Sequence, residues 1–306
     1  MYGFINQKKY FKIFLSQLLS LFFFLGVLSS SLSAQTDSLK NRRKLIIYSY
    51  STVYAASVVG FHQLWYKNYD QESFHFFNDN DQWLMMDKLG HGFSAYALTK
   101  YTAKSYEWAG IEKDKATLYG GLTSTLLFTT VEVFDGFSSE WGFSWGDFLA
   151  NIGGSALSYT QQRFLKEEIL ALKYSYMPTK YRAIRPEILG SNHLEGLLKD
   201  YNGQTYWASL NLNALSKQIK WEWLNIAFGY SGQGMLRGRG SYQIEEGTIY
   251  HPQRQYFLSL DLNLERIPTQ NLFLKTVLSV FNVIKVPFPA VEFHESGKAK
   301  FHYLYF

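Results

Sequence analysis

The sequence contains no cysteine among its 306 residues, and only 6 prolines. Without cysteine there are no disulfide bonds and no thiolate metal ligands, and no residue can carry the lipid of a bacterial lipoprotein. The formal net charge is only +5. No run of basic residues interleaves with aromatic ones, so we expect no nucleic-acid partner.

Two sequence patterns that would identify a reaction are absent as well: the chain has no His-Glu-x-x-His zinc pattern and no Walker phosphate loop. Any function must therefore be argued from individual polar residues and from the location of the protein.

The N-terminus has the three parts of a secretory signal peptide. Lysines 8, 9 and 12 precede an apolar stretch from Leu18 to Val27, and small residues end at Ala34. The apolar core of about ten residues is much shorter than the ~20 that span a bilayer, which favours cleavage over an uncleaved anchor helix. We therefore predict a signal peptide over residues 1–34 and an exported protein of the periplasm or outer membrane. Cleavage removes three lysines and no acidic residue, which leaves about +2.

Aromatic residues are abundant, at 18% of the chain. Rings with polar tips favour membrane interfaces, so a membrane surface is the predicted partner. A large aromatic core is the alternative explanation. The sequence predicts no particular protein partner.

Residues 35–172 are predicted to be helical. The uncharged run from Leu45 to Tyr66 is long enough to span a membrane, but Arg42, Arg43 and Lys44 would then lie on the outer side. That placement opposes the positive-inside tendency, so we expect a buried or membrane-surface helix rather than a spanning one. Further helices are predicted near 84–106, 113–134 and 145–170. A stripe at helical spacing predicts their core: Leu122, Leu126, Leu127 and Val131.

Residues 173–306 are predicted to be rich in strands. Apolar and polar residues alternate with a period of two over 206–212, 224–230, 255–264 and 298–306. We expect four or five antiparallel strands in a half-buried sheet packed on or beside the bundle, and contact of this sheet with the outer membrane stays open. The predicted fold class is α+β, with about four helices followed by this β-rich region.

Three consecutive helical segments each carry a polar pair. Asp87 and His91 are one turn apart, which is the arrangement of a carboxylate that orients a general base. A surface ion pair is the simpler explanation. Lys88 and Tyr96 lie on the same segment.

The second and third segments supply further oxygen ligands. Glu132 and Asp135 lie at the negative end of a helix, where carboxylates are unfavourable unless they bind something, and Gly136 is expected to close that helix in a left-handed conformation. Asp147 and Asn151 are one turn apart, and Ser144 is the expected N-cap for Asp147.

A bundle can direct such pairs at one centre. Asp87, His91 and Glu132 are the candidate catalytic residues. The metal is not identified, but a hard divalent cation such as Mg²⁺, Ca²⁺ or Mn²⁺ suits these ligands better than zinc. The candidate binding residues are Lys88, Tyr96, Asp135, Asp147 and Asn151.

These segments, in this order, resemble the YfiM-like family of bacterial envelope proteins, a domain of unknown function, over residues 84–160. The shared pattern is Asp-Lys-x-x-His with a later Tyr, then Glu-x-x-Asp, then Asp-x-x-x-Asn-x-x-Gly, ending here at Gly154. A more distant similarity is to VanZ-like proteins, which are linked to glycopeptide-antibiotic tolerance. The resemblance implies an envelope location and a helical core, and it implies no reaction.

Two hypotheses follow. In the first, the polar residues of an uncharacterised exported envelope protein bind a ligand or cation, or stabilise the bundle. In the second, the protein is an envelope hydrolase or transferase that acts on lipid or cell-wall precursors.

Overall fold

The computed structural model describes residues 39–61, 71–139, 141–244, 247–295 and 297–306. The predicted signal peptide lies outside these residues. The chain divides into two compact units. The helical unit consists of the described residues up to Asp79 together with those of Ser94–Lys166, and the strand unit consists of the described residues of Asn80–Phe93 and Glu167–Phe306.

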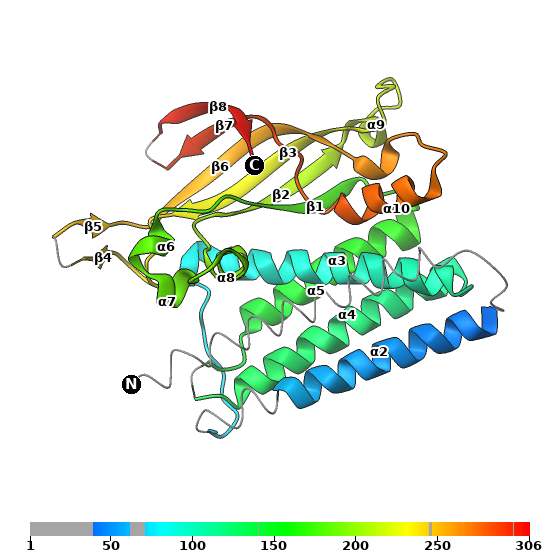
Figure 1. The fold of residues 1–306 in the computed structure, drawn as a ribbon, viewed down its shortest axis with the longest axis horizontal. Coiled ribbons are helices and arrows are strands. Elements are labelled where there is room, and N and C mark those ends of the chain that lie inside the picture. The colour runs from blue at the N-terminus through cyan, green and yellow to red at the C-terminus, as the bar shows by residue number, and fades with distance from the viewer. Residues whose placement is uncertain (1–38, 62–70, 140, 245–246, 296) are drawn as a thin grey trace. The chain divides into compact units, whose positions relative to one another are not determined.

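Four long helices are described: α2 (Leu39–Phe61), α3 (Met86–Trp108), α4 (Lys113–Gly136) and α5 (Trp145–Thr160) (Figure 1). The predicted helices near 84–106 and 113–134 are confirmed to within about two residues. The third ends earlier than predicted, because a π-helical turn over Gln161–Leu165 leads into a strand at Leu170. Within the described residues, no helix combines the length and the apolar character needed to cross a membrane.

One face of α2 is buried in the helical unit. Ile46, Tyr50 and Val53 belong to its apolar core, and the Tyr50 hydroxyl lies 2.6 Å from the hydroxyl of Ser105. The guanidinium of Arg43 donates to the carbonyl oxygen of Gly110 at 2.7 Å.

The predicted core stripe of α4 is only half correct. Leu127 and Val131 are buried, but Leu122 and Leu126 are 58% and 57% exposed. The inward face of α4 consists largely of small residues, because α3 approaches it closely. A Cβ on Gly120 would lie 2.7 Å from the carbonyl oxygen of Thr99. Small residues permit such an approach, and the larger leucines then point outward.

The strand unit contains a six-stranded antiparallel sheet in the order β1-β2-β3-β6-β7-β8, and β4 (Tyr242–Gln243) pairs with β5 (Ile249–Tyr250). The α+β fold class is confirmed. The predicted strands correspond to β2, β3, β6 and β8, whereas β1 and β7 were not predicted. The bounds of the six are β1 (Leu170–Tyr176), β2 (Gln204–Asn211), β3 (Leu224–Gln233), β6 (Gln253–Leu262), β7 (Phe288–His294) and β8 (Ala299–Tyr305).

Short helices connect several of these strands. None of α6–α9 was predicted, because each is at most two turns long. The connecting helices are α6 (Tyr181–Ile184), α7 (Pro186–Leu189), α8 (His193–Lys199), α9 (Leu212–Leu215) and α10 (Leu272–Phe281), with 3₁₀ turns at Gln82–Met85 and Leu264–Arg266.

The sheet curls around one of its faces. Tyr305 on β8 stacks on Phe257 of β6 at 4.3 Å, and its hydroxyl lies 3.2 Å from that of Thr205 on β2. In a flat sheet, β8 and β2 would be about 19 Å apart, since neighbouring strands are about 4.8 Å apart. We call the enclosed face the inner face and the opposite one the outer face.

The inner face carries the polar rows of the alternating strands. On β6, Gln255, Ser259 and Asp261 are buried, whereas Leu258 and Leu260 between them are exposed. The alternation itself was correctly predicted, but the polar row is the buried one. The reason is that the enclosed polar groups hydrogen-bond one another, so that their burial does not leave them unsatisfied.

Candidate functional site

Hydrogen bonds between buried serines hold three helices together at one level. The hydroxyl of Ser124 on α4 donates to the carbonyl oxygen of Ala95 on α3 at 3.0 Å. The hydroxyl of Ser155 on α5 donates to that of Ser124 at 3.1 Å. These contacts fix the register of α3, α4 and α5. Helix α4 runs antiparallel to α3, and α5 runs antiparallel to α4 (Figure 1).

Helix geometry then places the candidate residues. An α-helix rises about 1.5 Å per residue, so four residues correspond to about 6 Å and eight to about 12 Å. The hydrogen-bonded residues Ala95, Ser124 and Ser155 define one level of the bundle. His91 lies four residues before Ala95 on α3, and Asn151 lies four residues before Ser155 on α5, in the same direction along the bundle. Asp87, Glu132 and Asp147 are each eight residues away on their own helices. The three carboxylates therefore share a level, one turn beyond the histidine.

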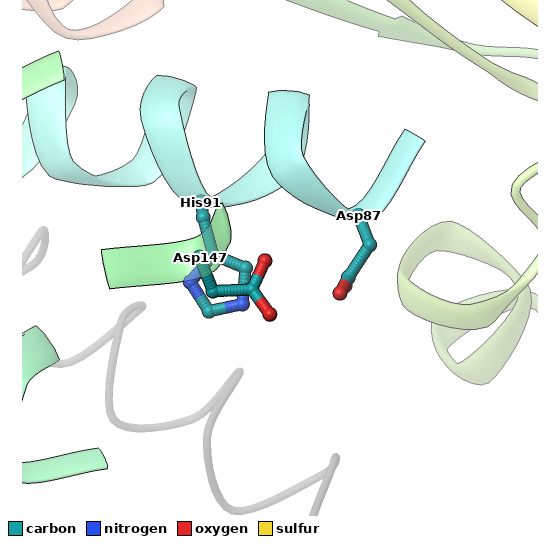
Figure 2. A group of neighbouring side chains, drawn as sticks. All are labelled: Asp87, His91 and Asp147. Atoms are coloured by element: carbon teal, nitrogen blue, oxygen red, sulfur yellow. The ribbon is translucent and has the colours of Figure 1, made fainter. Parts of the chain in front are cut away.

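Three of the predicted residues form a compact group (Figure 2). One carboxylate oxygen of Asp87, one ring nitrogen of His91 and one carboxylate oxygen of Asp147 all lie within 4.8 Å of one another. Asp147 is buried, whereas the side chain of Asp87 keeps 30% of its surface exposed.

The N-cap of α5 connects Asp147 with Glu132. The hydroxyl of Ser144 accepts from the backbone N–H of Asp147 at 3.1 Å, which confirms the predicted cap. The backbone N–H of Ser144 donates to Oε2 of Glu132 at 3.4 Å. The same hydroxyl donates to Oδ1 of Asp79 at 2.7 Å. Asp79 was not predicted, although it lies in the polar run Asn78–Asp81.

Two neighbours contact Asp87. The ammonium of Lys88 lies 3.4 Å from Oδ2, and the hydroxyl of Tyr201 donates to Oδ1 at 2.8 Å. Tyr201 is 114 residues further along the chain, so no local pattern around Asp87 indicates this contact. Burial raises the pKa of Tyr206, and the nearby Asp87 charge raises it further. Tyr206 therefore stays protonated.

A strained turn precedes these residues. Trp83, Leu84 and Met85 have φ angles of 50°, 52° and 66°, in the left-handed region that residues with side chains disfavour. Two hydrogen bonds hold the turn. The backbone N–H of Trp83 donates to the carbonyl oxygen of Gly238 at 2.7 Å, and the hydroxyl of Tyr230 donates to the carbonyl oxygen of Leu84 at 2.6 Å. Such strain costs energy and recurs near functional sites.

The remaining predicted residues are outside the three-residue group. Tyr96, Lys88, Asn151 and Glu132 are buried, and Asp135 is half-buried. All lie on the helices that carry the group or on α4.

Gly136 differs from the prediction. It is the last residue of α4 and does not have a positive φ angle. It contacts Phe74 instead, since a Cβ at this position would lie 2.3 Å from that ring.

The sequence analysis missed a second buried polar group, on the inner face of the sheet. The ammonium of Lys173 lies 2.7 Å from Oδ2 of Asp261, and that of Lys285 lies 3.8 Å from Oδ1. All three side chains are completely buried. Burial lowers the pKa of Lys285 to about 8: Asp261 opposes this shift and the charge of Lys173 adds to it.

This charged group is part of a longer polar network. The hydroxyl of Ser209 donates to Oδ2 of Asp261 at 2.6 Å and accepts from the amide of Asn225 at 2.9 Å. Ser209 and Asp261 both lie in alternating polar rows that the sequence displays. The alternating polar rows could have indicated this buried network, but polar residues at alternate positions of a strand are explained more simply by exposure to solvent.

Residues 74–163 match a family described as a predicted periplasmic lipoprotein family, DUF2279. No curated protein and no solved structure matches the chain. The match covers less than a third of the chain and includes Asp87, His91, Glu132, Asp135, Asp147 and Asn151. These 306 residues contain no cysteine to carry a lipid. The predicted export to the periplasm or outer membrane is confirmed by the family description, and the chain is similar over this region to an uncharacterised envelope family.

Proposed function

We propose that Asp87, His91 and Asp147 bind a divalent cation in an exported envelope protein. The observation that carries the proposal is the convergence of two carboxylate oxygens and one imidazole nitrogen within 4.8 Å. Three such ligands leave further coordination positions for water or a ligand molecule.

The location of the group supports the same function. Two acidic residues close together repel each other, and burial of Asp147 removes the water that would screen them. A bound cation would offset both costs. The partial exposure of Asp87 provides a side from which an ion can enter.

Mn²⁺ is the expected ion. Carboxylate ligands suit Mg²⁺, Ca²⁺ and Mn²⁺, whereas imidazole nitrogen suits Zn²⁺ and other transition metals. Mn²⁺ accepts both kinds of ligand, and a single histidine is fewer than zinc sites usually have.

The proposal also covers the processing, location, kinship and domain organisation of the chain. We infer that residues 1–34 are a cleaved signal peptide and that the exported chain lies in the periplasm or is associated with the outer membrane. Kinship with YfiM-like and, more distantly, VanZ-like proteins is supported by the ordered motif from Asp87 to Gly154. The helical region over 35–172 and the β-rich region over 173–306 are proposed as its domains.

Thermal unfolding in the presence of metal ions tests the cation site. Purified protein stripped with a chelator should gain stability on addition of MnCl₂, by about 2.7 kcal/mol when free Mn²⁺ is 100 times the dissociation constant. Asp147→Asn and His91→Gln should each lose at least tenfold in affinity, measured by calorimetric titration. Parallel titrations with MgCl₂, CaCl₂ and ZnCl₂ rank the ions.

Asp114→Asn is the matched control, because Asp114 is a surface carboxylate of the helical unit paired with Lys166 at 2.6 Å. It should bind Mn²⁺ as tightly as the wild-type protein. The proposal fails if none of the four ions raises the unfolding temperature, or if Asp147→Asn binds as tightly as the control.

A further inference from the structure

The outer face of the sheet exposes a continuous row of apolar side chains. Register pairs Phe228 on β3 with Leu258 on β6, Leu258 with Val291 on β7, and Val291 with Phe301 on β8. Residues paired in this way share a face, so the row crosses four adjacent strands. Phe228 is 53% and Phe301 55% exposed. Leu260, Tyr256 and Phe293 widen the exposed area.

The register that exposes this row is firmly fixed. A shift by one residue would exchange the two faces of a strand. On β6 such a shift would expose Phe257 and would remove Asp261 from Lys173 and Ser209. The apolar outer row is therefore a stable property of the sheet.

Side chains along β3 and β6 follow the polarity profile of a membrane. Trp221 and Trp223 lie just before β3 with ring centroids 6.3 Å apart, and Trp221 is exposed. Beyond the apolar rows, Tyr230 and Tyr256 are paired at 5.5 Å. Tryptophan and tyrosine are enriched at the two interfaces of a bilayer.

Charged residues occur only past the tyrosines on this face of the two strands. Arg254 pairs with Glu295 at 3.0 Å and also donates to the hydroxyl of Tyr230 at 3.2 Å. Between the tryptophans and the tyrosines, the outward positions of β3 and β6 are Leu224, Ile226, Phe228, Leu258, Leu260 and Leu262.

We propose that this outer face docks against the hydrocarbon of a lipid bilayer. Along the strands, the outer face carries tryptophan, then aliphatic residues, then tyrosine and an ion pair. This order matches the zones of a bilayer from one interface through the hydrocarbon to the other, whereas binding to a partner protein does not require such an order. The proposal is independent of the cation site, since none of Asp87, His91 and Asp147 lies on β3, β6, β7 or β8.

Vesicle flotation tests the docking. Purified protein should float with vesicles of phosphatidylethanolamine and phosphatidylglycerol in a 3:1 ratio, and 0.5 M NaCl should not release it. The triple variant Phe228→Ser/Leu258→Ser/Phe301→Ser should partition at least tenfold less. The matched control is Leu194→Ser/Leu215→Ser/Ile249→Ser, which alters three exposed apolar residues elsewhere in the strand unit. Equal flotation of the two variants would overturn the proposal.

Site-specific labelling gives a test that does not depend on the triple variant. Because the chain has no cysteine, Leu258→Cys can carry a single environment-sensitive fluorophore. Its emission should shift to the blue on addition of vesicles, whereas the same label at Leu194→Cys should not respond. A blue shift that follows protein concentration without vesicles would show that a second copy of the chain covers this face and would refute lipid docking.

Discussion

Helices α3 and α5 and the six-stranded sheet both bury polar side chains, but the charges of these side chains are balanced differently. On α5, Asp147 and Asn151 are buried, whereas Trp145 and Leu149 are exposed. On β6, Asp261 is buried and Leu260 is exposed. On both of these elements, polar side chains are enclosed and apolar ones face outward.

The difference lies in the source of positive charge. In the sheet the chain itself supplies it, since Lys173 and Lys285 both contact Asp261 on the inner face. On α3 and α5, two carboxylates and a histidine converge at a partly exposed position. We infer that the first group serves the fold and that the second is suited to an ion from solution.

The largest expected effect concerns the buried ion group of the strand unit. Asp261→Asn leaves two lysine ammonium groups buried without their carboxylate, and we expect a loss of about 3–5 kcal/mol in the free energy of unfolding. Urea denaturation measures it. Asp114→Asn, at an exposed ion pair of the helical unit, should leave the midpoint nearly unchanged. Equal losses in both variants would remove the distinction between the units.

The next largest effect is a difference in stability loss between substitutions on the buried and the exposed face of α4. Leu127→Ala creates a cavity in the core and should cost about 2–5 kcal/mol. Leu126→Ala, one residue earlier on the exposed face, should change stability by less than about 0.5 kcal/mol. Thermal unfolding of both variants provides the comparison, and a large loss for Leu126→Ala would mean that a partner or a membrane covers that face.

A smaller effect is expected at the cap of α5. Ser144→Ala removes the acceptor of the Asp147 N–H and should cost about 1 kcal/mol. Ser144→Thr retains the hydroxyl and serves as the control. If the cap also positions Asp147 for a cation, Ser144→Ala should weaken Mn²⁺ binding, and calorimetric titration of both variants measures that change. Unaltered affinity in Ser144→Ala would show that the cap is purely structural.

The last effect is a pH dependence in the strand unit. With a folded-state pKa of about 8 against an ordinary value of 10.5, Lys285 binds fewer protons in the folded than in the unfolded state between these values. Stability therefore rises with pH across that window. The stability of the wild type relative to Lys285→Met should increase from pH 8 to 10.5, as measured by urea denaturation. Lys275→Met, at an exposed lysine, should give a flat difference. A flat difference for Lys285→Met would contradict the prediction.

Much of the fold follows from local patterns. Helical periodicity located α3 and α4 to within about two residues, and alternation located β2, β3, β6 and β8. The two missed strands had weaker signals, since β1 directly follows a helical segment and β7 contains Pro289. Spacing also predicted the polar pairs on α3, α4 and α5, because one-turn neighbours share a helix face.

The sequence by itself determined the alternating rows, the helix spacings, the cap at Ser144 and the absence of thiol chemistry. Only the tertiary structure decided which face of each element is buried, since that depends on what encloses it. The curled sheet holds its polar row inside, where Lys173 and Asp261 neutralise each other. The serine contacts between helices set the register that brings Asp147 to Asp87 and His91. Such long-range contacts join residues far apart in the chain, and no local pattern records them.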